Sequence, residues 1–198
     1  MNSPEIATAA ATAILDTQRW LERAVIGLNL CPFAKAVHVK GLIRYAVSEA
    51  TTSAELLNDL KNELNYLVNL DEAGVSVAYD TTLLIAPYCL LDFFDFNDFL
   101  GKADKLIAKM KLEGIIQLAN FHPQYQFAGT EPDDITNFTN RAPYPTLHLL
   151  RESSIDQAVE AFPEAETIFE VNMETMQRLG RKGWDALEVG KTNPARSP

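Results

Sequence analysis

Segments with the periodicity of helices and of strands alternate along this chain of 198 residues, and the alternation limits its fold more than any other feature. Leucines recur three or four residues apart over residues 56–68, which is the spacing of the buried stripe of an amphipathic helix. Residues 82–86 are instead almost wholly apolar, as in a central strand. The predicted order is a helix over 3–27, a strand over 39–47, a helix over 52–68, a strand over 82–86, a helix over 95–114, a strand over 115–121, a long loop, a strand over 146–150, a short helix from 154 and a helix over 163–180.

This order predicts an α/β (or α+β) fold. Strand–helix–strand connections usually form right-handed parallel units, so the first three strands should be parallel, with the fourth antiparallel beside the third. We expect a single domain over residues 1–189, with a mixed, mostly parallel sheet of about four strands packed with helices. A ferredoxin-like two-layer arrangement and a three-layer arrangement both remain open. Residues 190–198 are predicted to form a flexible tail.

Three local signals indicate where helices begin. Thr52 and Glu55 have the spacing of a capping box. Asp95 is predicted to cap the helix whose apolar stripe runs over residues 96–110. Thr130 and Asp133 predict one helical turn over residues 132–137, inside the long loop.

Composition narrows the classes of partner and the cellular location. The formal charge of −10 disfavours nucleic acid and anionic membranes as partners, because both are bound through clustered Lys and Arg. No apolar run is long enough to span a bilayer, and the first twenty residues lack the basic start of a signal peptide. Cys31 and Cys89 are far apart in the sequence and are expected to be reduced thiols. These features predict a cytoplasmic protein.

The loop after the third predicted strand, from His122 to Tyr144, is the strongest candidate for a functional site. Structureless loops longer than about 12–15 residues are uncommon and are usually functional or disordered. The aromatic residues in this loop argue against disorder. Ligands of sheets with parallel strands bind beyond the carboxyl ends of the strands, where the loop begins. A structural loop that packs its own rings over the sheet edge is the alternative.

His122 is the expected acid or base of this site. A neutral imidazole exchanges a proton near pH 7, and Asp134 or Asp133 is in a position along the chain to orient it. The alternative is a histidine that is hydrogen-bonded to the backbone of the loop.

Arg141 and Asn140 are expected to hold a small anionic ligand, because a guanidinium beside an amide suits a carboxylate or a phosphate. Tyr125 and Tyr144 complete the predicted ligand-binding set. The alternative for Arg141 is an ion pair with Asp133 or a neighbouring acid that closes the loop.

A metal site is a weaker hypothesis. His122, His148 and Asp134 together form a ligand set known from catalytic zinc and non-haem iron. Their spacing matches no compact metal motif, and His148 alternates with leucines on a predicted strand, which favours a buried core histidine. The sequence names no cofactor.

Cys31 is a candidate nucleophile. Pro32 suits the first position of a short helix, which would put Cys31 at the N-cap with Lys35 one turn further on. Helix N-termini and nearby cations lower the pKa of a thiol. The alternative is a small buried cysteine among its apolar neighbours.

The chain also resembles a known bacterial family through three stretches. These are RWLERAVIGLNLCPFAK, DTTLLIAP and FHPQYQFAGTEPDDITNFTNRAPYPTLHLLRE. The family is uncharacterised and is catalogued only as a domain of unknown function. The resemblance implies a cytoplasmic bacterial protein, and it implies no activity and no catalytic residue.

Three functional hypotheses follow from the residues. The first is an enzyme acting on a small anionic metabolite at the carboxyl edge of the sheet, with His122 as acid or base and Cys31 as a possible nucleophile. The second is a metal-dependent enzyme that uses His122, His148 and Asp134. The third is a non-catalytic ligand-binding or assembly module, whose aromatic loop docks a partner or a second copy in a homo-oligomer.

Overall fold

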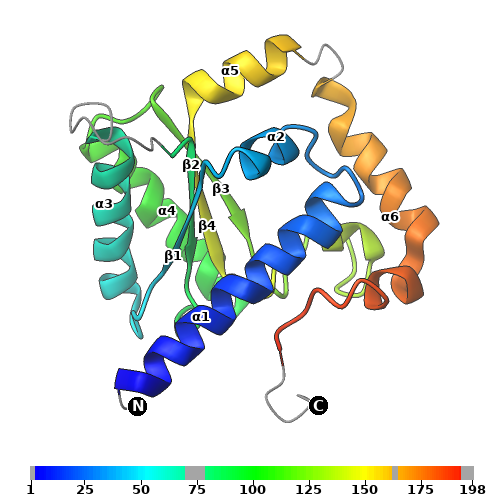
Figure 1. Cartoon of the computed structure of the whole chain (residues 1–198), viewed down its shortest axis with the longest axis horizontal. Coiled ribbons are helices and arrows are strands. Elements are labelled where there is room, and N and C mark those ends of the chain that lie inside the picture. Colours follow the sequence, from blue (N-terminus) through cyan, green and yellow to red (C-terminus); the bar gives the residue numbers. More distant parts are fainter. Residues whose placement is uncertain (1–2, 70–78, 162–164, 193–198) are drawn as a thin grey trace.

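A four-stranded sheet forms the centre of the computed structural model, which describes residues 3–69, 79–161 and 165–192 (Figure 1). In sequence order the strands are β1 (Ile43–Val47), β2 (Thr81–Ile85), β3 (Ile116–Phe121) and β4 (Thr146–Arg151). The order across the sheet is β1-β2-β4-β3. β1 and β2 pair in parallel, and β4 pairs antiparallel with both β2 and β3, so the first three strands share one direction. The predicted mixed, mostly parallel sheet is confirmed.

β4 lies between β2 and β3, whereas the sequence predicted only that it pairs with β3. Leu147 of β4 lies opposite Leu84 on one side and Asn120 on the other. Both Leu147 and Leu149 have an exposed fraction of 0%. The central position covers these side chains from both neighbouring strands, and the long loop before β4 allows the chain to return to it.

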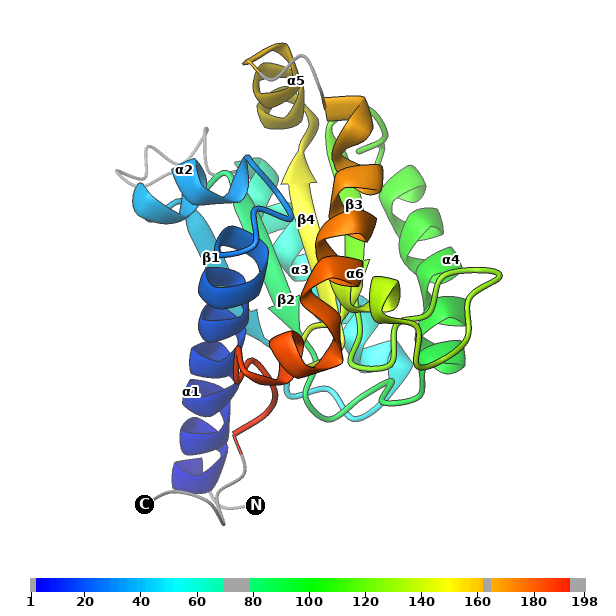
Figure 2. The same cartoon turned by 90° about the vertical axis from the view of Figure 1, so that its right-hand side faces the viewer.

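Helices cover both faces of the sheet, which makes this a three-layer fold (Figures 1 and 2). One face packs against α3 (Ser53–Asn69) and α4 (Phe93–Lys109). The other packs against α1 (Ser3–Trp20), the π-helix η1 (Leu21–Ile26) and α6 (Ile168–Asp185). Toward the end of the sheet where β4 finishes lie α2 (Ala34–Val39) and α5 (Glu152–Ala161). The ferredoxin-like two-layer alternative is therefore wrong. No helix in the described part of the chain is both long and apolar enough to cross a membrane.

The face that α3 and α4 cover holds an apolar core. Both helices bury the stripe that their sequence periodicity predicts, against apolar side chains of the sheet. A fully buried Leu or Phe side chain contributes about 1.5–3 kcal/mol to folding by leaving water. The stripe residues with an exposed fraction of at most 1% are Leu56, Leu60, Leu64, Leu67, Phe96, Phe99 and Ala103.

The starts of α3 and α4 follow capping chemistry. The capping box of α3 is confirmed: the backbone N–H of Thr52 donates to Glu55 Oε2 at 3.0 Å, and the N–H of Glu55 donates to Thr52 Oγ1 at 3.3 Å. The predicted cap of α4 at Asp95 is wrong. Asp92 caps this helix, and its Oδ1 accepts from the N–H groups of Phe94 and Asp95 at 2.8 and 3.2 Å. Asp92 has the extended backbone that a cap requires, whereas Asp95 already lies in the first turn.

The first helical region ends near Gly27, as predicted, but its last part is the π-helix η1. A Cβ atom at Gly27 would lie 2.3 Å from the carbonyl oxygen of Arg23, so no larger residue fits. The next segment departs from the prediction, because residues 34–39 form α2 and the strand begins only at Ile43. Gly41, with a φ of 68°, turns the chain between the two.

The last helix continues past its predicted end. Gly180 has a φ of 64° and kinks α6, but the chain returns to helix as far as Asp185 and buries Trp184 against the α1 side. Residues 186–192, here called the C-terminal strap, then run beside α1 (Figure 1). The predicted start of this helix at Pro163 lies outside the described residues.

Candidate functional site

A cleft of about 340 Å³ lies at the carboxyl edge of the parallel strands. One wall comes from residues 122–145, here called the site loop, and the opposite wall comes from α6 and the C-terminal strap. The lining is mostly apolar and includes two cationic side chains. Its residues are Pro123, Phe138, Arg141, Ala142, Pro143, Trp184, Val189, Gly190 and Lys191.

His122 is fully buried and both of its ring nitrogens are engaged by the backbone. Nε2 lies 3.1 Å from the carbonyl oxygen of Leu90, and Nδ1 accepts from the N–H of Gln124 at 3.0 Å. This pairing selects the neutral tautomer with the proton on Nε2. Burial lowers the pKa of His122, and the rings of Phe93 and Phe96 lie 5.5 and 5.1 Å from its own. In this geometry His122 has no free nitrogen for acid–base chemistry, which matches the alternative of a backbone-bonded histidine.

Asp134 does not orient His122 in this structure. It caps the short 3-10 helix η2 (Ile135–Asn140), accepting from the N–H and the hydroxyl of Thr136 at 2.8 and 2.7 Å. These hydrogen bonds lower the pKa of Asp134, because they favour its charged form. The predicted turn over residues 132–137, capped by Thr130, is therefore shifted toward the C-terminus. Thr130 instead donates to the carbonyl oxygen of Phe127.

Cys31 lacks the surroundings of a reactive thiol. Burial raises its pKa, which opposes formation of a thiolate. The expected N-cap position is wrong, because α2 begins at Ala34 and Phe33 precedes it at the cap. Cys31 packs against the core beneath α1, whereas His122 packs against Phe96 of α4 on the opposite face of the sheet. The structure does not bring this Cys–His pair together.

The metal hypothesis finds no ligand cluster in the described residues, where no three His, Cys, Asp or Glu side chains are grouped to hold an ion. His122, His148 and Asp134 are each engaged elsewhere. His148 Nε2 lies 2.6 Å from the hydroxyl of Thr81, and Thr81 donates onward to the carbonyl oxygen of Leu149. Burial lowers the pKa of His148 to about 4, so this ring is neutral at pH 7.

Arg141 brings a fixed positive charge to the cleft. Its Nε donates to the carbonyl oxygen of Tyr125 at 3.1 Å, its Nη2 to that of Pro132 at 2.5 Å, and its guanidinium lies 4.2 Å from the centre of the Phe138 ring. The alternative ion pair with Asp133 or its neighbour is absent among the described contacts. Burial and nearby Arg181 lower the pKa of Arg141, as expected of a cation with no carboxylate beside it.

Lys191 brings a second cation to the opposite wall. Its Nζ lies 4.8 Å from the centre of the Tyr144 ring, and it forms no ion pair with any described residue. Burial lowers the pKa of Lys191, although the charge of Asp16 acts in the opposite direction, and the charges of Lys191 and Arg141 both lower the pKa of His122. The sequence placed Lys191 in a flexible tail, where nothing distinguished it from other lysines.

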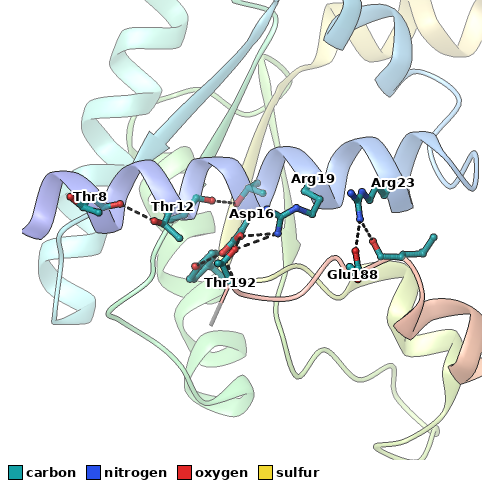
Figure 3. Close-up of polar contacts among 11 residues, drawn as sticks. Thr8, Thr12, Asp16, Arg19, Arg23, Glu188 and Thr192 are labelled. Carbon is teal, nitrogen blue, oxygen red and sulfur yellow. Dashed lines mark hydrogen bonds and ion pairs between the residues drawn. The ribbon is translucent and has the colours of Figure 1, made fainter. Parts of the chain in front are cut away.

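Asp16 is a buried carboxylate that the sequence analysis did not single out. Its Oδ2 accepts from Tyr144 Oη and from the N–H of Thr192, each at 2.9 Å, and its Oδ1 accepts from the hydroxyl of Thr192 and from Arg19 (Figure 3). Asp16 thus joins α1, the site loop and the C-terminal strap. Residue 192 belongs to the predicted tail, so the first residues of that tail are held in place, whereas residues 193–198 lie outside the described residues. The signal for Asp16 was its place on the buried stripe of α1, four residues before Trp20.

The remaining predicted ligand-binding residues shape the site loop. The hydroxyl of Tyr144 is directed to Asp16 and is buried. Asn140 accepts the N–H of His122 with its carbonyl oxygen at 3.2 Å, and the ring of Tyr125 packs against Phe93 and Phe127. Of the predicted set, Arg141 is the side chain that lines the cleft.

Comparison with known proteins agrees with the motifs in the sequence. No match was found among curated proteins or among solved structures. A family model described as a protein of unknown function (DUF1415) matches residues 12–186, which include all four strands and the whole site loop. The chain therefore belongs to the DUF1415 family of proteins of unknown function.

Proposed function

We propose that this protein binds a small organic anion with an apolar body in the cleft between the site loop and the C-terminal strap. The observation that carries the proposal is the pairing of Arg141 and Lys191 on opposite walls of a mostly apolar cleft. Neither forms an ion pair with a described residue: Asp16 acts on Lys191 only through its charge, and no described carboxylate offsets the charge of Arg141. An uncompensated cation at a partly buried site is stabilised by an anionic ligand.

The guanidinium of Arg141 is preorganised for binding an anion. Its Nε and Nη2 are held by backbone carbonyls and its plane lies over Phe138, so Nη1 is the group left to donate to a ligand. A rigid guanidinium loses little side-chain entropy on binding, which favours a planar acceptor such as a carboxylate.

The apolar lining supports a ligand that is more than a bare ion. Pro143, Val189 and the rings of Phe138 and Trp184 provide contact surface for a hydrocarbon or aromatic body. A volume of about 340 Å³ suits a small metabolite. We therefore favour a monocarboxylate with an apolar chain or ring, and we place it in the cytoplasm because Cys31 and Cys89 are both free thiols.

Binding is proposed rather than chemistry by a Cys–His pair. His122 has both nitrogens engaged, and the raised pKa of Cys31 keeps it a thiol. The part of the first hypothesis that we carry forward is the anionic ligand at the carboxyl edge.

Fluorescence of Trp184 provides a direct test, because this ring forms part of the cleft wall. We expect phenylacetate or hexanoate to give a saturable change, and neutral phenylacetamide to give none. Arg141→Gln should weaken binding of the carboxylate about tenfold or more, the worth of one charge-assisted hydrogen bond. The matched control is Arg181→Gln, which removes a guanidinium from the same Phe138 ring but not from the cleft lining, and should change affinity less than about twofold.

Two outcomes would contradict the proposal. One is equal binding of the acid and its amide, which would show that charge does not select the ligand. The other is an absence of saturable binding by any of the carboxylates.

A further inference from the structure

Five aromatic rings from three separate segments form a continuous row, here called the aromatic ridge. Its members in order are Phe94, Phe93, Tyr125, Phe127 and Phe169. Successive ring centres are 6.2, 5.2, 5.0 and 5.8 Å apart. The row joins the start of α4 on one face of the sheet, the site loop, and the start of α6 on the other face. None of these rings lines the cleft.

The two ends of the ridge are open to solvent. Phe94 has an exposed fraction of 74% and Phe169 of 55%, and Leu91, beside the first end, has 53%. Contiguous exposed apolar surface of this kind is rare on proteins that act alone, and aromatic side chains are enriched in protein interfaces. Each exposed ring contacts an inner ring of the row, Phe94 at Phe93 and Phe169 at Phe127.

The segments that provide the rings of the ridge carry acidic side chains, and the cation Arg141 donates to the backbone of Tyr125. Residues 79–101, 115–140 and 165–177, which provide the rings, contain no lysine or arginine. They contain four, three and three acidic residues, among them Asp95 beside Phe94 and Glu170 beside Phe169. A second copy would bring the same acids against these, and like charges across an interface oppose association. Nucleic acid is disfavoured for the same reason.

We propose that the aromatic ridge is a docking surface for a cationic amphipathic segment of another protein. Apolar side chains of that segment would cover Phe94 and Phe169, and its Arg or Lys side chains would pair with the flanking acids and lie over the rings. This site is separate from the cleft and does not depend on the proposed ligand.

A synthetic helical peptide with leucines on one face and arginines on the other is the probe, and fluorescence anisotropy of a label on the peptide measures its binding. We expect saturable binding that weakens as salt is raised. The double variant Phe94→Ala/Phe169→Ala should weaken it about tenfold or more, because exposed aromatic anchors carry a large share of such interfaces. Asp95→Lys/Glu170→Lys should weaken it as well.

The matched control removes exposed apolar groups elsewhere. Val39→Ala/Val159→Ala changes side chains with exposed fractions of 75% and 44% on α2 and α5, and should leave the affinity within about twofold. Equal binding of the double phenylalanine variant would overturn the proposal, because attraction by net charge alone would then explain the complex. Equal binding of a peptide with glutamate in place of arginine would also overturn it.

Self-association provides an independent check. Sedimentation of the unlabelled protein should show no dimer that depends on Phe94 and Phe169. A dimer that the double variant abolishes would assign the ridge to a second copy and overturn the proposal. Neither result affects the carboxylate titration of the cleft, so the two proposals fail separately.

Discussion

The two faces of the sheet are built by different means. The face under α3 and α4 is packed mainly by leucine, phenylalanine, alanine and isoleucine, and its buried polar residues include His122 and Thr82. The face under α1 and α6 includes buried polar groups among its apolar side chains, with Asp16 and Thr17 on α1 and Thr81 and Thr146 on the strands. The cleft opens on the α1 side, and the carboxylate that organises it is buried there.

The two faces also differ in how far apart in the sequence their contacting segments lie. α3, β2, α4 and β3 follow one another along the chain and bury the stripes that their own periodicity predicts. On the α1 side, Asp16 bonds to residues 128 and 176 positions away. Joining such distant segments costs more chain entropy, and hydrogen bonds to one buried carboxylate define how they meet. We expect the α3/α4 face, with the larger core, to contribute more of the stability, whereas the α1 face carries the cleft.

The largest expected effect is on the α3/α4 face. Phe99→Ala removes a ring with an exposed fraction of 1% and should lower the free energy of unfolding by about 3–5 kcal/mol, through lost burial and a cavity. Urea unfolding followed by circular dichroism measures this change. Phe94→Ala on the same helix, with an exposed fraction of 74%, is the control and should change stability by less than about 0.5 kcal/mol. If Phe99→Ala lowers the free energy of unfolding by less than about 1 kcal/mol, this face is not the main source of stability.

A smaller effect is expected at Asp16. Asp16→Ala leaves the hydroxyl groups of Tyr144 and Thr192 without their acceptor. We expect it to lower the free energy of unfolding by about 2–4 kcal/mol. The loss should be accompanied by faster hydrogen exchange at residues 187–192, because the strap loses its attachment to α1. Glu188→Ala, which breaks only the exposed pair with Arg23, should change stability by less than about 1 kcal/mol. Unchanged exchange in the strap of Asp16→Ala would show that Asp16 does not hold it.

The smallest effect is a pH dependence that arises within the sheet on the α1 side. The pKa of His148 is about 4 in the folded chain against an ordinary value of 6.5, so the unfolded chain takes up the proton first as pH falls. Stability should therefore be full above pH 6.5 and decrease as pH falls toward 4.

Urea unfolding at several pH values tests this dependence, and the pKa of His122 is also lowered, so His148→Asn should remove only part of it. An unchanged slope in His148→Asn would show that the acid sensitivity comes from elsewhere.

Local sequence patterns predicted where a helix starts when the residues of a single turn are enough to determine its cap. The Thr52–Glu55 capping box needs only a single turn of helix, and both of its hydrogen bonds are present. The same reasoning failed at Asp95, because two aspartates three residues apart both suit a cap, and only the backbone conformation at Asp92 selects between them.

A cleft lies at the sheet edge where the sequence predicted a functional site, and Arg141 is the residue of the predicted set whose side chain lines it. That the site loop has a functional role stays a prediction. His122 and Cys31 suited catalysis by residue type, yet the backbone bonds of one and the burial of the other could not be read from spacing. Lys191 and Thr192 were assigned to a tail, because only a distant partner, Asp16 for Thr192, gives that segment a fixed place.

By itself the sequence determined the α/β class, the direction of all four strands and the buried stripes of α3 and α4, because each depends on periodicity within one element or on the handedness of its connections. The tertiary structure decided the central position of β4, the third layer, the neutral state of His122 and His148, and the walls of the cleft. These features depend on which distant segments bury one another, and hence on desolvation and hydrogen bonding that no local pattern records.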